Sequence, residues 1–259
     1  ISQINVDLMK KVENNKYDLV FIYRGQHILP ETIKTMQFYG SIVFIYNNDN
    51  PFSAHYPKYF WRHFLQSAIV CDHVFSYRVE NIEQYKLLGQ SNVSLLRSYY
   101  LKEYNFFINP EKFESDVIFI GHYEKDGRDE ILKHLIENNI KTRIYGWGWE
   151  GSNYFKELSK YGKIRPVFGK EYNEKINKSK IALVFLSKIN RDTYTRRCFE
   201  ILATKTLMLS EYTRDLASLF KPNIDAIYYT NKNDCLEKIK YLINNKNILN
   251  EVSKSGYQK

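Results

Sequence analysis

The fold is decided by residues 192–203, which read DTYTRRCFEILA, together with residues 205–210, which read KTLMLS. Asp192 or Thr193 offers a side-chain oxygen to the free N–H groups of a first helical turn. Four side chains then recur at helical spacing on one inward face: Tyr194, Cys198, Ile201 and Leu202. The apolar run that follows has the length of a buried strand. The stretch therefore predicts a loop, a helix and a buried strand in succession.

The same succession recurs through the second half of the chain. Strands are expected at 116–120, 141–145, 181–185, 207–209 and 226–229, a helix at about 127–138, and a helical C-terminus from Asp234 onward. Five or six parallel strands with helices between them predict a doubly wound α/β sheet.

The first half of the chain alternates in a similar way. After a first helix that ends near residue 15, strands are expected at 17–23, 41–46, 73–77 and 93–96, with helices at 30–38, 59–69 and 79–88. Each strand–helix–strand unit predicts a right-handed crossover onto a parallel sheet. Residues 97–115 have no periodicity and contain Asn109-Pro110, as a domain linker does. We therefore expect two domains, 1–112 and 113–259.

Composition places the chain among globular proteins. It is 44% hydrophobic and 16% aromatic, and no apolar run approaches the roughly 18 residues of a membrane helix. Its three cysteines, Cys71, Cys198 and Cys235, are odd in number and far apart, which favours reduced thiols and a cytoplasmic setting. The start of the chain shows no basic-then-apolar secretory pattern.

The net charge of +9 favours an anionic partner, and a nucleotide, the anionic surface of a membrane and a nucleic acid all qualify. The lysines are scattered, however, which favours an ordinary solvated surface as the explanation of the charge. There is no basic stripe with interleaved aromatic residues, so no dedicated nucleic-acid site is expected.

Arg197 and Glu200 are the first candidate site residues. They lie three apart on the predicted helix, just after a cap that leaves the helix N-terminus at the carboxyl end of a sheet. The helix N-terminus and Arg197 suit phosphate oxygens, while Glu200 suits ribose hydroxyls. The alternative is a plain exposed ion pair between the two side chains.

The segment Arg197-x-x-Glu200-Ile-x-Ala, with the short strand and the stretch 212–220 after it, resembles the nucleotide-sugar site of group-1 glycosyltransferases, specifically the spore-maturation-protein (CgeB-like) type. The resemblance implies a GT-B fold, in which two Rossmann-like, doubly wound parallel-sheet domains face each other across a cleft. It also implies a hexosyltransferase-like enzyme that binds a UDP-, GDP- or dTDP-sugar in the C-terminal domain, next to an acceptor-side N-terminal domain. A Glu-x7-Glu pair usual in the group stands here as Asp192-x7-Glu200, so its first position departs from the pattern.

The resemblance implies further donor-binding residues. Gly121 ends a strand, and His122 and Arg128 follow it. Gly146 and Trp147 end the next strand, on the base side of the cleft. Tyr172 corresponds to a family tyrosine ahead of the key loop, and Thr195 and Asp192 flank the helix start. For each the structural alternative is an ordinary turn glycine, surface polar residue or chance tyrosine.

Other chemistries find little support in the sequence. The histidines lack metal-ligand spacing, and there is no Asp-x-Asp pair, Walker loop or Gly-x-Ser-x-Gly elbow. We therefore expect no metal and no cofactor beyond the sugar nucleotide. Catalytic roles are assigned to Glu200 and Arg197, and Asp49 and His55 are the candidates for a general base on the acceptor side. Asp49-Asn50-Pro51 also echoes an Asp-rich turn of the family.

The predicted function is therefore transfer of a sugar from a nucleotide sugar to a glycan, a protein or another cell or virion component. Two alternatives stay open: a non-catalytic sugar-nucleotide-binding or scaffold protein of the same fold, and a nucleic-acid-modifying glycosyltransferase. Family members begin with one more strand, so the N-terminal domain is expected to lack its first strand here.

Overall fold

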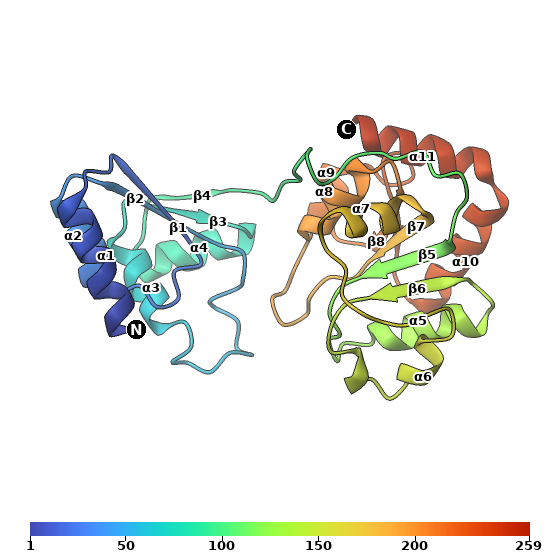
Figure 1. The fold of residues 1–259 in the computed structure, drawn as a ribbon, viewed down its shortest axis with the longest axis horizontal. Helices are drawn as coiled ribbons and strands as arrows, with labels where there is room; N and C mark the ends of the chain where they lie inside the picture. Colours follow the sequence, from blue (N-terminus) through green and yellow to red (C-terminus); the bar gives the residue numbers. More distant parts are fainter. The chain divides into compact units, whose positions relative to one another are not determined.

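The computed structural model describes all 259 residues, which form two compact units (Figure 1). Unit 1 comprises Ile1–Ser98 with Ile189–Arg191, and unit 2 comprises Tyr99–Lys188 with Asp192–Lys259. The division lies between residues 98 and 99, whereas we expected it near 112. Residues 99–112 belong to unit 2 because Asn173 and Asn177 side-chain oxygens accept from the backbone N–H groups of Phe106 and Ile108, at 3.1 and 2.7 Å.

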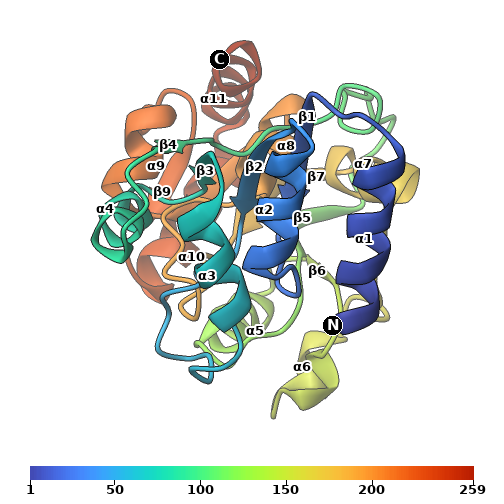
Figure 2. The same ribbon diagram turned by 90° about the vertical axis from the view of Figure 1, so that its left-hand side faces the viewer.

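Unit 1 is a parallel four-stranded sheet in the order β1-β2-β3-β4. Its elements are α1 (Ser2–Asn14), β1 (Leu19–Tyr23), α2 (Pro30–Phe38), β2 (Ile42–Asn47), α3 (Arg62–Val70), β3 (His73–Ser76), α4 (Val79–Leu88) and β4 (Val93–Leu95). Because the sheet order follows the chain order, right-handed crossovers place the connecting helices on the same face. Figure 2 shows α1, α2 and α3 side by side in front of this sheet.

The core of unit 1 lies between that helical layer and the sheet. Val43, Ile45 and Val74 point into it, opposite Ile33 and Phe64 from α2 and α3, and all five are buried. Alternate strand residues point to the other face, since the period of a strand is two. The helical spacing of apolar residues in α2 and α3, and their alternation along the strands, therefore explain why the core forms between the helices and the sheet.

Unit 2 is a parallel five-stranded sheet in the order β6-β5-β7-β8-β9. Its elements are β5 (Ser115–Ile120), α5 (Arg128–Glu137), β6 (Thr142–Tyr145), η1 (Trp149–Gly151), α6 (Phe155–Leu158), α7 (Gly169–Asn177), β7 (Ser179–Val184), α8 (Arg196–Ala203), β8 (Leu207–Glu211), α9 (Arg214–Leu219), β9 (Ile227–Tyr229), α10 (Lys232–Asn244) and α11 (Lys246–Gln258). None of the chain's helices has both the length and the apolar character needed to cross a membrane.

The order of this sheet has a reversal point. The chain passes from β5 to β6 on one side and then returns to β7 on the other side of β5. In open α/β sheets, ligands bind outside the carboxyl ends of the strands at such a reversal. The loops that follow β5 and β7 are therefore where a ligand is expected in unit 2. The predicted α/β fold with two parallel-sheet, Rossmann-like domains is confirmed.

Candidate functional site

Helix α8 begins at the carboxyl edge of the sheet of unit 2, but its cap is not one of the two expected residues. Thr195 is the N-cap, and its hydroxyl accepts from the backbone N–H of Arg197 at 3.1 Å. Thr193 is instead bound to Asp215 of α9, Oγ1 to Oδ2, at 2.6 Å. The backbone N–H of Asp192 donates to the carbonyl of Ser187 at 2.9 Å, which closes the loop before the helix. The expected inward face is correct, because Tyr194, Cys198, Ile201 and Leu202 are all buried.

Arg197 and Glu200 do not form the exposed ion pair that was the structural alternative for these two residues. Glu200 pairs instead with Arg196, four residues earlier, with Nε and Oε1 2.7 Å apart. The guanidinium of Arg196 lies over the ring of Tyr99, 5.0 Å from its centroid, which favours this partner. The side chain of Arg197 is half-buried and makes no hydrogen bond or ion pair, so a cation is left unpaired at the start of α8.

The other carboxylate oxygen of Glu200 is held from α7. The hydroxyl of Tyr172 donates to Oε2 at 2.7 Å. Tyr172 lies in the first turn of α7, which starts at Gly169. Burial of this hydroxyl and the neighbouring charge of Glu200 raise the pKa of Tyr172 well above its ordinary value, so the hydroxyl stays a proton donor.

Two exposed rings lie at the same N-terminal end of α7. Trp147 follows β6 and is 59% exposed, and its ring centroid lies 5.1 Å from that of Phe168, the N-cap residue of α7. Trp149, two residues on, is fully buried, and its Nε1 donates to the carbonyl of Gly121 at 2.9 Å. The sequence singled out Trp147, but nothing in it indicated Phe168. The two rings form an aromatic surface next to the helix that holds Glu200 through Tyr172.

Gly121 and Gly146 bring the ends of β5 and β6 into close contact. Gly146 has φ +141°, and a Cβ at this position would lie 1.9 Å from the carbonyl oxygen of Gly121. No residue with a side chain fits there without a shift of the backbone. Gly146 is therefore required by the close approach of two backbones, whereas a Cβ on Gly121 would meet the ring of Phe119 at 2.6 Å.

His122 and Arg128 belong to a charged cluster at the reversal point. The side chain of Arg128 is only 4% exposed, and its guanidinium bonds to Asp126 at 2.7 Å, to Glu124 at 3.3 Å and to the carbonyl of His122 at 2.8 Å. Arg128 is thus fully engaged within its own loop. The exposed ring of His122 pairs through Nε2 with Glu124 Oε1 at 2.8 Å.

Glu124, which sequence reasoning missed, is the centre of this cluster. It is buried and also accepts a hydrogen bond from Ser187 after β7, at 3.0 Å, so it joins the loops that follow β5 and β7. Burial alone would raise the pKa of Glu124. The hydrogen bond from His122 and the charge of Arg128, with the bond from Ser187, nevertheless hold this pKa below the ordinary value of 4.5. No local sequence signal indicated this pairing, because Glu124 lies in the loop before α5 and the i,i+4 rule applies within a helix.

The acceptor-side candidates lie in unit 1. Asp49 follows β2 and forms an ion pair with Arg24, which follows β1, while its backbone N–H donates to Asn47 Oδ1 at 3.0 Å. The backbone N–H of His55 donates to the hydroxyl of Ser53 at 3.3 Å. Across the chain, no group of three or more His, Cys, Asp or Glu side chains is arranged to hold a metal ion.

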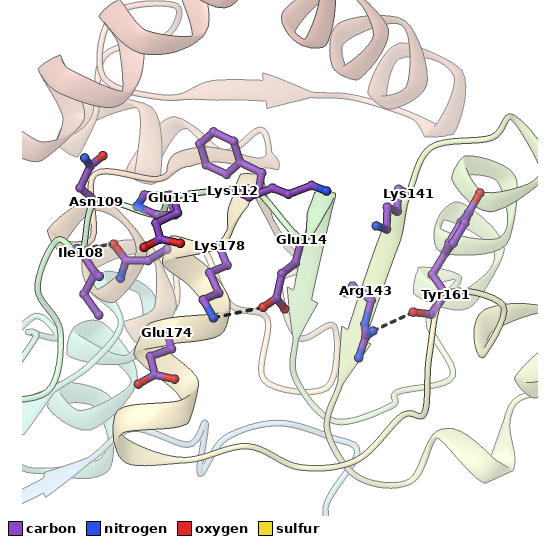
Figure 3. A pocket seen from close by; sticks show the side chains of 13 residues that line it. Ile108, Asn109, Glu111, Lys112, Glu114, Lys141, Arg143, Tyr161, Glu174 and Lys178 are labelled. Carbon is purple, nitrogen blue, oxygen red and sulfur yellow. Dashed lines mark hydrogen bonds and ion pairs between the residues drawn. The ribbon is translucent and has the colours of Figure 1, made fainter.

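Unit 2 also has a pocket of about 730 Å³ at the opposite, amino edge of its sheet (Figure 3). It lies between the 108–114 segment, the end of α7 and the first residues of β6, and Lys178 and Glu114 form an ion pair in it at 3.2 Å. Because the reversal-point loops lie at the other edge, this pocket is separate from the site described above.

Comparisons with known proteins identify the family and the fold of the chain. The chain belongs to the glycosyl transferase-like family, whose model matches residues 128–259. The sequence matches no curated protein. Its fold is that of the GT-B glycosyltransferases, as solved structures with 10 to 12% sequence identity show.

Three of these structures hold bound molecules. HepE of Anabaena, with UDP and glucose, is 10% identical with a TM-score of 0.70, over 97% of this chain and 75% of HepE. The pneumococcal O-GlcNAc transferase GtfA, with UDP and GlcNAc, is 12% identical with a TM-score of 0.71, over 98% of this chain and 55% of GtfA. A Staphylococcus aureus TarM mutant, with fondaparinux, alpha-GlcNAc-glycerol and UDP, is 12% identical with a TM-score of 0.67, over 97% of this chain and 54% of TarM.

Proposed function

We propose that this glycosyltransferase takes its sugar from a UDP-sugar, bound at the carboxyl edge of the sheet of unit 2. The observation that carries the proposal is the start of α8. There the unpaired side chain of Arg197 lies beside the free N–H groups of a capped helix, three residues before a carboxylate that is held in place. A diphosphate, which is anionic, suits the first feature, and a ribose diol suits the second.

Each part of the donor then has a partner in this proposal. Arg197 and the N-terminal N–H groups of α8 bind the diphosphate, and Glu200 accepts hydrogen bonds from the ribose. Trp147 and Phe168 offer their exposed rings to the base, and Gly121 and His122 line the phosphate side. Arg128 stabilises this loop and does not bind the donor itself, because its guanidinium is already bonded to Asp126 and to the carbonyl of His122. Uridine is favoured over guanosine and thymidine because HepE, GtfA and TarM hold UDP.

The reaction breaks the bond between the anomeric carbon of the sugar and the diphosphate oxygen, and forms a bond from that carbon to an acceptor oxygen. The acceptor loses a proton, and UDP leaves with the negative charge that develops on its oxygen. Arg197 and the start of α8 stabilise that charge, which makes the protein metal-independent in this proposal. Asp49 is the proposed base for the acceptor proton.

The same comparisons support a proposal for the acceptor class. A glycan or protein acceptor is proposed, since GtfA is an O-GlcNAc transferase and the TarM complex contains glycan-type molecules. We assign the chain to the spore-maturation-protein type on the motif Arg197-x-x-Glu200-Ile-x-Ala. A cytoplasmic location is proposed from its three buried, unpaired cysteines. Contact with anionic membranes is proposed from the charge of +9 alone.

A thermal-shift screen of UDP, GDP and dTDP with their common sugars tests the proposal. UDP and one or more UDP-sugars should raise the melting temperature, because a ligand at about 100 times its Kd stabilises the native state by about 2.7 kcal/mol. Absence of a shift with every nucleotide would refute the donor assignment. A shift without release of UDP in the presence of glycan or protein acceptors would favour a binding protein over an enzyme.

A further inference from the structure

We propose that Tyr172 is a positioning residue that orients Glu200 toward the ribose, and that it thereby gives this protein its preference for ribonucleotide over 2′-deoxyribonucleotide donors. This inference rests on the proposed function. The juxtaposition that supports it is a carboxylate from α8 held between a phenol from α7 and a guanidinium from its own helix.

Glu200 is held at both oxygens. Oε1 pairs with Arg196 Nε and Oε2 accepts from the Tyr172 hydroxyl, each at 2.7 Å, and the side chain is only 13% exposed. A carboxylate accepts about four hydrogen bonds. Two acceptor positions are therefore occupied by protein, and the remaining one on each oxygen has its direction set by the two anchors.

Tyr172 is itself well placed to hold this orientation. It lies on α7, whose Asn173 and Asn177 side chains are bonded to the backbone of Phe106 and Ile108. Its hydroxyl remains protonated because burial and the charge of Glu200 raise the pKa of Tyr172. The phenol is thus a permanent donor on a helix anchored at several points, whereas Arg196 is a flexible side chain that is nearly half exposed.

The two remaining acceptor positions match a vicinal diol, which donates one hydrogen bond to each oxygen. A nucleotide that lacks the 2′-hydroxyl leaves one position of a mostly buried carboxylate without a donor. An unmade hydrogen bond to a buried charged group lowers affinity by roughly tenfold or more. Discrimination of this kind needs a carboxylate that cannot rotate toward the single remaining hydroxyl, and Tyr172 supplies that restraint.

The experiment is calorimetric titration of UDP and 2′-deoxy-UDP into the wild-type protein, Tyr172→Phe and Tyr228→Phe. Tyr228 is the matched control, because its hydroxyl is also buried in unit 2 and donates to the carbonyl of Phe220 at 2.7 Å. The wild type and Tyr228→Phe should prefer UDP by about tenfold or more. In Tyr172→Phe the preference should fall to about threefold or less, through weaker binding of UDP and nearly unchanged binding of 2′-deoxy-UDP.

Arg196→Gln is a second variant in case Tyr172→Phe folds poorly, since it releases the other oxygen of Glu200 from an exposed position. It should also narrow the preference for UDP. An unchanged UDP preference in Tyr172→Phe, or in Arg196→Gln if the first variant does not fold, would overturn the inference. Wild-type protein that binds both nucleotides equally overturns the inference alone, whereas wild-type protein that binds neither overturns the proposed function as well.

Discussion

Replacement of Glu124 by glutamine tests whether the charged cluster holds the reversal point of unit 2 together. The change removes the carboxylate that pairs with His122 and Arg128 but keeps an amide oxygen for Ser187. Breaking a buried ion pair costs about 3 to 5 kcal/mol. Because Arg128 keeps its bonds to Asp126 and to the carbonyl of His122, we expect a smaller loss in the free energy of unfolding, about 2 kcal/mol at pH 7.

The stabilisation that Glu124 provides should depend on pH. The pKa of Glu124 is lowered in the folded state, so the unfolded chain binds the proton more tightly. The contribution of Glu124 is therefore present above its ordinary pKa of 4.5 and is lost as the pH falls through and below that value. Urea unfolding of both proteins from pH 7 to pH 3 should show their difference shrinking at the acid end.

The control for this experiment is Glu137→Gln on α5. Glu137 pairs with Lys133 at 2.7 Å on the exposed face of the helix, so its loss should not measurably change stability at pH 7. If Glu124→Gln is as stable as the wild type at pH 7, or if the difference stays constant down to pH 3, the cluster does not stabilise these loops through the carboxylate.

Three further predictions concern the site. Gly146→Ala should lower the free energy of unfolding by about 3 kcal/mol in urea unfolding, because its Cβ would meet the carbonyl of Gly121, whereas Gly127→Ala, with φ +91° and open space, should lose only about 1 kcal/mol. Trp147→Ala should change the free energy of unfolding by no more than about 0.5 kcal/mol but weaken UDP binding by about 1 to 3 kcal/mol in calorimetry. Equal UDP affinities in this variant and the wild type would contradict the role of the ring. Turnover should survive an excess of EDTA, and restoration of lost activity by a divalent ion would contradict metal independence.

The alternation of strands and helices made the fold predictable. Each predicted strand from 17–23 to 226–229 exists in the structure, because short apolar runs bounded by Gly, Pro or Asn leave few alternatives in a chain of this composition. The domain boundary was harder to place. Residues 99–112 have no periodicity. They join unit 2 because the backbone N–H groups of Phe106 and Ile108 donate to the side chains of Asn173 and Asn177, more than 60 residues away in sequence.

The sequence predicted the start of α8 at the carboxyl edge of the sheet, but it did not predict the side-chain pairings there. The sequence places Arg196 and Arg197 equally well to reach Glu200, and the ring of Tyr99, almost 100 residues earlier, favours the first. The cap was misplaced by two or three residues because residues 192, 193 and 195 all carry suitable oxygens. The contact of Thr193 with Asp215 leaves Thr195 as the cap. Such choices depend on long-range contacts that no local pattern encodes.

Titration of UDP into the wild type, Arg197→Ala and Lys254→Ala tests the central claim most directly. Arg197 is the unpaired cation at the start of α8, whereas Lys254 is an exposed cation on α11 of the same unit, so the two variants lose the same charge. Arg197→Ala should weaken UDP binding by roughly 2 kcal/mol, or about thirtyfold in Kd, at an unchanged melting temperature. Lys254→Ala should bind UDP as tightly as the wild type. Equal affinities in all three folded proteins would contradict a diphosphate site at this helix.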